Sequence, residues 1–459
     1  MSTALRRILE YACPDRVVTP EHACYDNLRQ LFNGMYDIRP ALICLPRNTA
    51  EVQSVIRYAR NAAIPTAVRG GGHNIGGAGS VADGLVIDLR LLNNITVLPA
   101  RSQARVGGGA TWADFDMAAS AYGLACTGGT FDTTGVGGLT LGGGIGHLMG
   151  SYGLACDNVE SYRLVTADGE ELLVDAEAHP ELNWALRGAG HHFGVVTEFT
   201  FKVHPLTTLY GGYVAYPGRH AGAVVRMFRD LMLAAPDELT CTLLLERYGP
   251  TQMPAAVISV AYNGHDPEYR AELDHTLRAI ETLDWQLRQR SYVSMQTALG
   301  RLPFGLRHYW SARCVDGLPD MLADAVVERF EAARITDPFN NTVLIEPIHG
   351  KVRQVPAEAT AVPFREARFN ITGMAIWQPE EAAGDQIGWA RSVASVAEPH
   401  SRWGDGYVNY VCDKPDDGAL RAVRTFGVDN YMRLLTIKRE VDPDNFFRSS
   451  YALNQEVRA

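Results

Sequence analysis

The sequence predicts an α+β fold that is divided into two domains. At 459 residues the chain is too long for one hydrophobic core, because single cores stop growing at about 250 to 300 residues. Glycine clusters and short strand patterns fill residues 1–205, whereas residues 206–400 carry longer helical patterns that alternate with strand-like runs. We therefore expect a first domain over 1–205, an inserted α/β domain over 206–400, and a C-terminal segment over 401–459 that returns to the first domain.

The first domain begins with the pattern of a strand, a helix and a second strand. Residues 41–45 form an apolar run before Pro46, and the next polar residues are helix-cap candidates. Residues 66–68 predict the second strand, which runs directly into a glycine loop, as strands often do at ligand sites. The cap candidates are Asn48 and Thr49, and the apolar residues at helical spacing are Val52, Val55, Ile56 and Ala59.

Alternation and turn residues predict the rest of the first domain. Residues 111–121 predict a capped helix that Gly123 closes. The Asp168-Gly169 turn between two alternating runs predicts a β-hairpin over 161–174. Further strands are expected at 85–89, 95–98, 104–106 and 195–203.

The inserted domain and the C-terminal segment have fewer glycines and clearer apolar runs. The C-terminal residues 406–411, which include two tyrosines and two valines, are strand-like. A helix is predicted from its cap at Asn430, through Leu434, Leu435 and Ile437, to the Asp442-Pro443 pair. In the inserted domain, strands are expected at 243–245, 257–260 and 342–345.

Charge and cysteine content exclude several classes of partner. A formal net charge of −10 and a pI of 5.7 argue against binding to nucleic acid or to anionic membranes. No apolar run follows the first arginines, so we expect a cytoplasmic protein without a secretory signal. The eight cysteines include no Cys-x-x-Cys pair, and we expect them to be reduced packing residues with no metal site.

Two glycine clusters, at residues 70–77 and 135–146, are the clearest functional signal. Glycine lets a backbone approach a ligand and direct N–H groups at a pyrophosphate, so a diphosphate cofactor fits both clusters. Neither cluster has the spacing of a Rossmann or P-loop fingerprint. For one isolated triple glycine, tight turns would be the better interpretation. His73 lies in the first cluster, although a lone histidine is more often structural than catalytic.

In the order and spacing of its motifs, the chain resembles the berberine bridge enzyme-like oxidases, within the FAD-linked family that includes vanillyl-alcohol oxidase. The resemblance implies a two-lobed, PCMH-type FAD-binding domain with an inserted α/β substrate domain that roofs the flavin. It also implies that His73 is bonded covalently to the 8α-methyl group of FAD. The segments that carry the resemblance are 33–46, 69–73, 135–146, 153–158, 184–188, 193–197, 407–410 and 437–447.

The chain departs from the family pattern at two places. Many relatives also attach the flavin through a cysteine before the second glycine cluster, and Phe131 occupies that position here. Cys126 lies five residues earlier and would need a shifted loop, so we expect a single covalent link through His73. The second departure is His191 and His192, where relatives usually carry a glycine and an asparagine.

The resemblance implies a tyrosine base at Tyr410, with Tyr407 as the second catalytic candidate, and simple packing is the alternative explanation for both. Because the pKa of tyrosine is ordinarily about 10, such a base needs either a stabilised phenolate or proton loss concerted with hydride departure. By the same resemblance, the residues expected at FAD are Arg69, Gly70, Gly71, Gly72, His73, Asn74, Gly76, Gly77, Thr134, Gly135, Gly137, Gly138, Gly142, Gly143, Gly144, Gly146, His147, Asp157, Asn158, Gly194, Val195, Val196, Tyr407, Asn409 and Asn445.

The expected activity is that of an oxidase. A base removes a hydroxyl or amine proton while hydride passes to the flavin, and dioxygen then takes the electrons and leaves hydrogen peroxide. The expected substrate is a small natural-product intermediate. Two alternatives stay open, a flavin dehydrogenase with a non-oxygen acceptor and a flavin-fold cyclase or binding protein without net redox chemistry. Candidates for the substrate cavity, which core packing explains equally well, are Tyr292, Arg307, His308, Tyr309, Trp310 and His349.

Overall fold

The first lobe is built on a small, mainly parallel sheet. A computed structural model describes residues 9–333, 341–380, 384–404, 406–412, 418–449 and 453. Helix α3 (Thr49–Asn61) follows the first inner strand, and the Asn48 side chain accepts a hydrogen bond from the Glu51 N–H at 2.9 Å, which confirms the predicted cap. In spatial order the strands are β1 (Val17–Val18), which is antiparallel, and then β2 (Leu42–Cys44), β4 (Leu85–Asp88) and β3 (Thr66–Arg69), which are parallel.

The second lobe is an antiparallel sheet of five strands. The predicted hairpin is present, since Tyr162 pairs with Val174 across the Asp168-Gly169 turn. The predicted helix is α4 (Trp112–Ser120), which Thr111 and Asp114 cap reciprocally. In spatial order the strands are β5 (Ile95–Leu98), β6 (Gln103–Gly107), β10 (Val195–Lys202), β8 (Val159–Val165) and β9 (Glu171–Val174).

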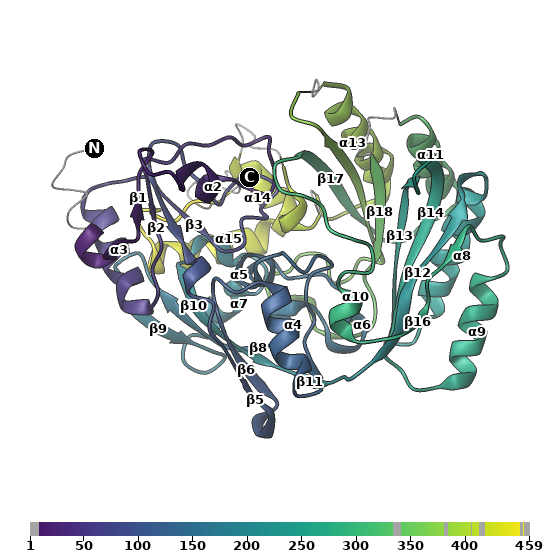
Figure 1. The fold of residues 1–459 in the computed structure, drawn as a ribbon, viewed down its shortest axis with the longest axis horizontal. Helices are drawn as coiled ribbons and strands as arrows, with labels where there is room; N and C mark the ends of the chain where they lie inside the picture. Colours follow the sequence, from purple (N-terminus) through teal and green to yellow (C-terminus); the bar gives the residue numbers. More distant parts are fainter. Residues whose placement is uncertain are drawn as a thin grey trace.

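A large antiparallel sheet dominates the second half of the chain. Figure 1 shows its strands upright beside the two lobes, with helices covering the face that is turned away from them. The strand order is β15 (Asp284–Trp285), β12 (Leu209–Pro217), β14 (Met253–Tyr262), β13 (Leu239–Tyr248), β18 (Thr342–Pro347), β19 (Phe369–Trp377) and β17 (Arg307–Val315), and β16 (Arg288–Arg290) also pairs with β12. The covering helices are α8 (Ala221–Ala234), α9 (Pro267–Leu277), α11 (Asp320–Glu331) and α13 (Gly384–Ala397).

Side chains alternate between the two faces of this sheet. In β13, Leu243 and Leu245 are fully buried in the core beneath the helices. Residues with even numbers in β13, β18, β19 and β17 point to the opposite face, because the register pairs Leu244 with Leu344, Leu344 with Thr372, and Thr372 with Ala312. We call this opposite face, which is turned toward the two lobes, the inner face.

The C-terminal segment corrects two of the sequence-based predictions. Residues 406–411 are not a strand, because Val408–Tyr410 form a short 3-10 turn, η8. Their side chains reach the first domain, with the Asn409 Nδ2 donating to the Leu139 carbonyl at 3.0 Å, and these contacts override strand propensity. Helix α15 (Val428–Val441) begins after Gly427 and not at Asn430, although it does end before Asp442.

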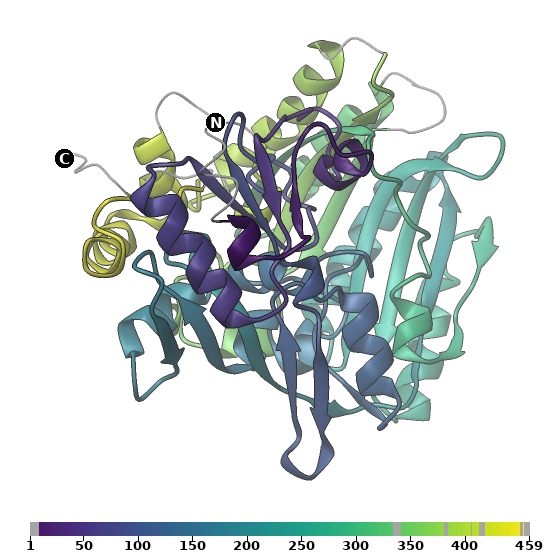
Figure 2. The same cartoon turned by 60° about the vertical axis from the view of Figure 1, so that its left-hand side comes forward.

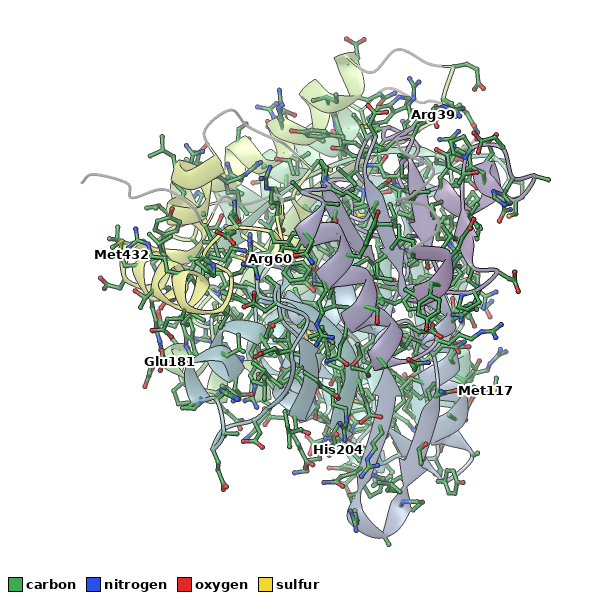
Figure 3. All side chains as sticks on the ribbon, turned by 90° about the vertical axis from the view of Figure 1, so that its left-hand side faces the viewer. Arg39, Arg60, Met117, Glu181, His204 and Met432 are labelled. Carbon is green, nitrogen blue, oxygen red and sulfur yellow. The ribbon has the colours of Figure 1, made fainter. Side chains whose placement is uncertain are left out.

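The end of the chain packs beside the N-terminal lobe, as the yellow helices in Figure 2 show. Arg60 of α3 pairs with Asp444 at 2.5 Å, and Arg433 of α15 pairs with Glu181 at 2.7 Å. Figure 3 shows Arg60 and Glu181 at this junction. Within the described ranges, no helix is both long and apolar enough to cross a membrane. Shorter elements are α2 (Tyr25–Arg29), β7 (Leu124–Ala125), α5 (Val136–Leu141), α6 (Met149–Tyr152), α7 (Pro180–Leu186), β11 (His204–Pro205), α10 (Tyr292–Met295), α12 (Lys351–Gln354) and α14 (Gly418–Phe426).

Candidate active site

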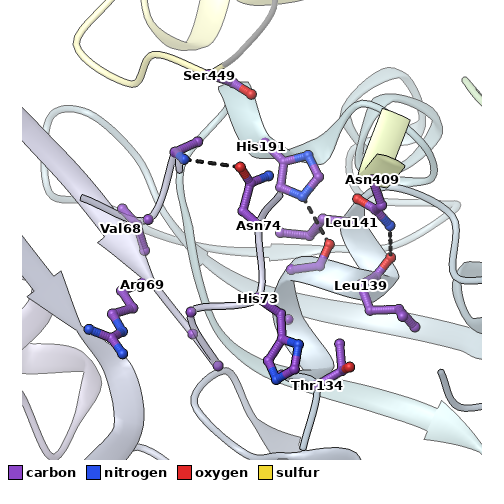
Figure 4. A pocket seen from close by; sticks show the side chains of 18 of the residues that line it. Val68, Arg69, His73, Asn74, Thr134, Leu139, Leu141, His191, Asn409 and Ser449 are labelled. Atoms are coloured by element: carbon purple, nitrogen blue, oxygen red, sulfur yellow. Dashed lines mark hydrogen bonds between the residues drawn. The ribbon is translucent and has the colours of Figure 1, made fainter. Parts of the chain in front are cut away.

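A long cavity lies where the two lobes, the large sheet and the C-terminal segment meet. It encloses about 1520 Å³ of empty space, including its open mouth. Figure 4 shows His73, Asn74, His191 and Asn409 around it. The parts of the chain that line it are the loop 69–75, the loop 130–139, residues 194–196, Trp310, the turn 407–410 and residues 447–449.

The two glycine loops touch each other at one wall of the cavity. A Cβ atom on Gly71 would lie 2.4 Å from the backbone nitrogen of Gly135, and one on Gly135 would lie 2.3 Å from the nitrogen of Gly71. Any side chain at either position would push the loops apart. Gly72 has a φ of +73°, which side-chain-bearing residues rarely adopt. Only glycine therefore allows the two backbones to form this wall together.

His73 extends from the first loop and has an unpartnered ring nitrogen. The ring is buried between aromatic neighbours, stacked on Phe32 at 4.4 Å with the edge of Phe304 at 5.2 Å. Burial, assisted by the nearby Arg69 cation, lowers the pKa of His73 to about 4. Among the described residues, no group hydrogen-bonds its buried Nε2 atom. His73 is thus a neutral imidazole with a lone pair or N–H left for a partner that is not protein.

His191 also faces the cavity, and its tautomer follows from one contact. Its Nε2 lies 2.9 Å from the Gly138 carbonyl oxygen, which can only accept a hydrogen bond. Burial lowers the pKa of His191, so the ring is neutral and the proton must be on Nε2. The Nδ1 atom is therefore a hydrogen-bond acceptor.

Tyr407 and Tyr410 also line the cavity, with their rings 4.8 Å apart. The Tyr407 hydroxyl accepts hydrogen bonds from the N–H groups of Gly144 at 3.1 Å and Ile145 at 3.3 Å, and so holds the second glycine cluster. The Tyr410 hydroxyl instead donates to the Glu346 carboxylate at 3.0 Å. The two tyrosines therefore have different surroundings and different roles.

Glu346 is a buried carboxylate on the inner face of the large sheet. Its second oxygen accepts a hydrogen bond from the Asn370 Nδ2 at 2.9 Å. Burial raises the pKa of Glu346 to about 7, despite these two donors. The pKa of Tyr410 is also raised, by burial and by the adjacent Glu346. Sequence reasoning missed Glu346, and the one signal was an acidic residue inside an apolar strand.

Comparisons with known proteins agree with this geometry. The family described as FAD binding domain matches residues 40–175, and the family described as berberine and berberine like matches residues 406–453. The chain is an FAD-linked oxidoreductase that carries both an FAD-binding domain and a berberine-like segment. It is 27% identical to the (R)-6-hydroxynicotine oxidase of Paenarthrobacter nicotinovorans over 96% of both chains. An FAD-linked oxidoreductase of Dictyostelium discoideum is 28% identical over 90% of this chain and 88% of its own.

Solved structures confirm the predicted fold class for this oxidoreductase. The 6-hydroxy-D-nicotine oxidase of Arthrobacter nicotinovorans superposes with a TM-score of 0.89 and 26% identity, covering 99% of this chain and all of its own. A single-residue variant of berberine bridge enzyme superposes with a TM-score of 0.87 at 19% identity, covering 99% of each chain, which shows a shared fold. The cofactor is FAD. The site fits it, because the paired glycine loops form a wall without side chains that a ligand can approach closely, and His73 presents an unpartnered ring nitrogen.

The oxidoreductase brings many of the expected cofactor residues to the cavity. Phe131 lines it at the position where relatives carry a cysteine, whereas Cys126 is buried elsewhere and burial raises the pKa of its thiol. Expected residues that line the cavity are Arg69, Gly70, Gly71, Gly72, His73, Asn74, Thr134, Gly135, Gly137, Gly138, Gly194, Val195, Val196, Tyr407 and Asn409.

Other expected residues support the loops from behind the cavity wall. Asp157 pairs with the buried Arg365 at 2.5 Å, and the Asn158 side chain donates to the Leu154 carbonyl at 2.9 Å. Of the candidates in the inserted domain, Trp310 lines the cavity, whereas Tyr292, Arg307, His308, Tyr309 and His349 do not. Further expected residues outside the lining are Gly76, Gly77, Gly142, Gly143, Gly144, Gly146, His147 and Asn445.

Proposed function

We propose that this oxidoreductase is an oxidase that takes hydride from a small organic substrate onto FAD bonded covalently to His73 alone. The observation that carries the proposal is the hydrogen bond from Tyr410, which lines the cavity, to the buried Glu346. When bound, FAD supplies the hydride acceptor and a reduced form that reacts with dioxygen to give hydrogen peroxide. The relatives named as 6-hydroxynicotine oxidases support oxidation of a small molecule.

Tyr410 and Glu346 form a proton path in which Tyr410 acts as the base toward the substrate and Glu346 accepts the proton of the Tyr410 hydroxyl. A stabilised phenolate does not fit, because the pKa of Tyr410 is raised and not lowered. A proton leaving the substrate hydroxyl or amine goes to the Tyr410 oxygen, while the Tyr410 proton moves to the Glu346 carboxylate at 3.0 Å. The substrate thus loses one proton and one hydride, and no free phenolate forms.

This path predicts an acid limb in the pH profile. Because burial raises the pKa of Glu346 to about 7, the carboxylate that accepts the proton is lost as pH falls below that value. We expect kcat/KM to rise with pH and to level off above about pH 7. In Glu346→Gln the limb should disappear and the remaining slow rate should be flat over that range. A wild-type limb that persists unchanged in the variant would contradict the assignment of Glu346.

The covalent link is tested by denaturing the protein in acid and looking for flavin fluorescence in a denaturing gel. We expect fluorescence in the wild-type band and none in His73→Ala, because the neutral imidazole, with its unpartnered Nε2, is the proposed attacking nucleophile. Cys126→Ala is the control and should remain fluorescent. A fluorescent His73→Ala band would contradict the single histidyl link.

The electron acceptor is tested by peroxide yield during turnover. We expect one hydrogen peroxide for each substrate molecule oxidised in air. A peroxide yield near zero, with turnover supported by an added dye acceptor, would indicate a dehydrogenase instead. We place the substrate among natural-product intermediates. A broad panel in which only simple sugars are oxidised would contradict that placement.

A further inference from the structure

A second carboxylate, Glu246, lies on the inner face of the large sheet. It is in β13, a strand with neighbours on both sides, and it pairs directly with Ala255 of β14. On its other side, the β13–β18 register pairs Leu245 with Val343, which brings Glu246 opposite Thr342. Glu246 is therefore held in the middle of a rigid sheet and not on a surface loop.

The sheet register connects Glu246 to the active site in one row. Thr342 pairs with Met374, and Met374 pairs with Trp310, which lines the cavity and packs against Tyr410 at 5.0 Å. Directly paired residues point to the same face, so these four side chains form a continuous row across four strands. With neighbouring strands roughly 4.8 Å apart, the row places Glu246 roughly 14 Å from Trp310.

Side chains in this part of the inner face keep slight exposure, including Leu344, which lies beside the row on β18 and is 9% exposed. Trp310, Met374 and Thr342 are 6%, 5% and 7% exposed, and Glu246 is half-buried. Asn370 and Thr372, on the same face of β19, are 0% exposed. The slightly exposed part of the inner face therefore extends from Trp310, which lines the cavity, along this row toward Glu246.

The two carboxylates of the inner face differ in their partners. Glu346 receives hydrogen bonds from Tyr410 and Asn370. For Glu246, no hydrogen bond or ion pair is found with any residue that the structure describes, and burial raises its pKa to about 7. A half-buried carboxylate without a donor is costly to keep in a sheet, unless something outside the protein supplies the missing charge or hydrogen bonds.

We propose that Glu246 is a distal anchor for a substrate that carries a cationic amine. The row beside it offers mainly apolar and aromatic surface, with one threonine, which suits a hydrophobic body better than a polyhydroxylated one. A cationic nitrogen gives an unpartnered carboxylate both charge compensation and a donor, whereas a neutral hydroxyl gives only the donor. The bound amine would lie at the far end of the row, so the carbon that is oxidised beside Tyr410 is not the carbon that bears this nitrogen.

This inference rests on the proposed function, because it takes the cavity beside Trp310 as the substrate site. The test compares three probes that share a phenyl group and a six-carbon chain, namely 6-phenylhexylamine, 6-phenylhexan-1-ol and 6-phenylhexanoic acid. Binding to the FAD-loaded enzyme is followed by tryptophan fluorescence and by the flavin absorption spectrum, without turnover. We expect the amine to bind about tenfold or more tightly than the alcohol, and the acid to bind most weakly.

Variants of Glu246 assign that preference to its charge. In Glu246→Gln the amine should lose about tenfold or more in affinity while the alcohol changes little. Glu246→Asp, which keeps the charge, should retain the order of the probes, and Glu272→Gln on the exposed side of α9 should match wild type. Equal binding of amine and alcohol by wild type, or an unchanged amine affinity in Glu246→Gln, would overturn the proposal. Because no step needs turnover, a failed oxidase assay would leave these binding results intact.

Discussion

Tyr410→Phe is expected to slow flavin reduction by about 100- to 10,000-fold, the range found when a positioned proton acceptor is removed. The substitution keeps the ring that packs against Trp310 and Tyr407, and removes only the hydroxyl that donates to Glu346 at 3.0 Å. The substrate proton then has no acceptor when the hydride leaves. Stopped-flow absorbance of the flavin under anaerobic conditions measures this step directly.

Glu346→Gln should cause a loss of similar size, because the amide cannot take the proton from Tyr410. If the two residues act as one path, the double variant should be little slower than either single variant. Tyr216→Phe is a matched control, since the Tyr216 hydroxyl donates to the Leu277 carbonyl at 2.8 Å in the core beneath the helices. That variant should reduce its flavin at the wild-type rate. Additive losses in the double variant would contradict the proton path.

Local sequence signals predicted those elements whose causes are local. The Asn48 cap, the Thr111 cap and the Asp168-Gly169 turn each depend on residues within a few positions of one another. The glycine clusters correctly predicted a ligand cavity, which both clusters line. Their contact with each other was not predicted. That contact joins Gly71 to Gly135, which are brought together only by the fold.

The missed features depend on contacts between distant segments. Glu346 and Tyr410 belong to different parts of the chain and meet only because η8 packs against the inner face of the large sheet. The same packing explains the wrong strand prediction at 406–411, where local propensity favours a strand and side-chain contacts with the first domain favour a turn. No local pattern contains that information.

Lys438 is a second long-range feature, and a strong stability effect is expected from it. Its ammonium group is 2% exposed and makes three hydrogen bonds, to the Asp442 carboxylate at 2.6 Å and to the carbonyls of His192 and Phe447 at 2.7 Å each. Asp442 is fully buried and also accepts from the Phe447 N–H at 2.8 Å. The lysine therefore links α15 to two segments of the cavity lining, the turn that carries His191 and residues 447–449.

Lys438→Met is expected to lower the free energy of unfolding by about 3 to 5 kcal/mol, because it leaves a buried carboxylate without its cation. Denaturant unfolding, followed by tryptophan fluorescence, measures the change. Arg433→Met on the same helix is the matched control. Its pair with Glu181 is solvent-exposed on both sides, at 37% and 55%, so the loss there should be at most about 1 kcal/mol.

The double variant Lys438→Met with Asp442→Asn separates charge from packing. If the unpaired carboxylate causes the loss, removing its charge should restore part of the stability, because the asparagine side chain still has an oxygen to accept from the Phe447 N–H. The same variants should change how well the cavity holds FAD, since His191 and Phe447 both line it. A double variant no more stable than Lys438→Met would assign the effect to the lost carbonyl contacts of His192 and Phe447 instead of to the charge.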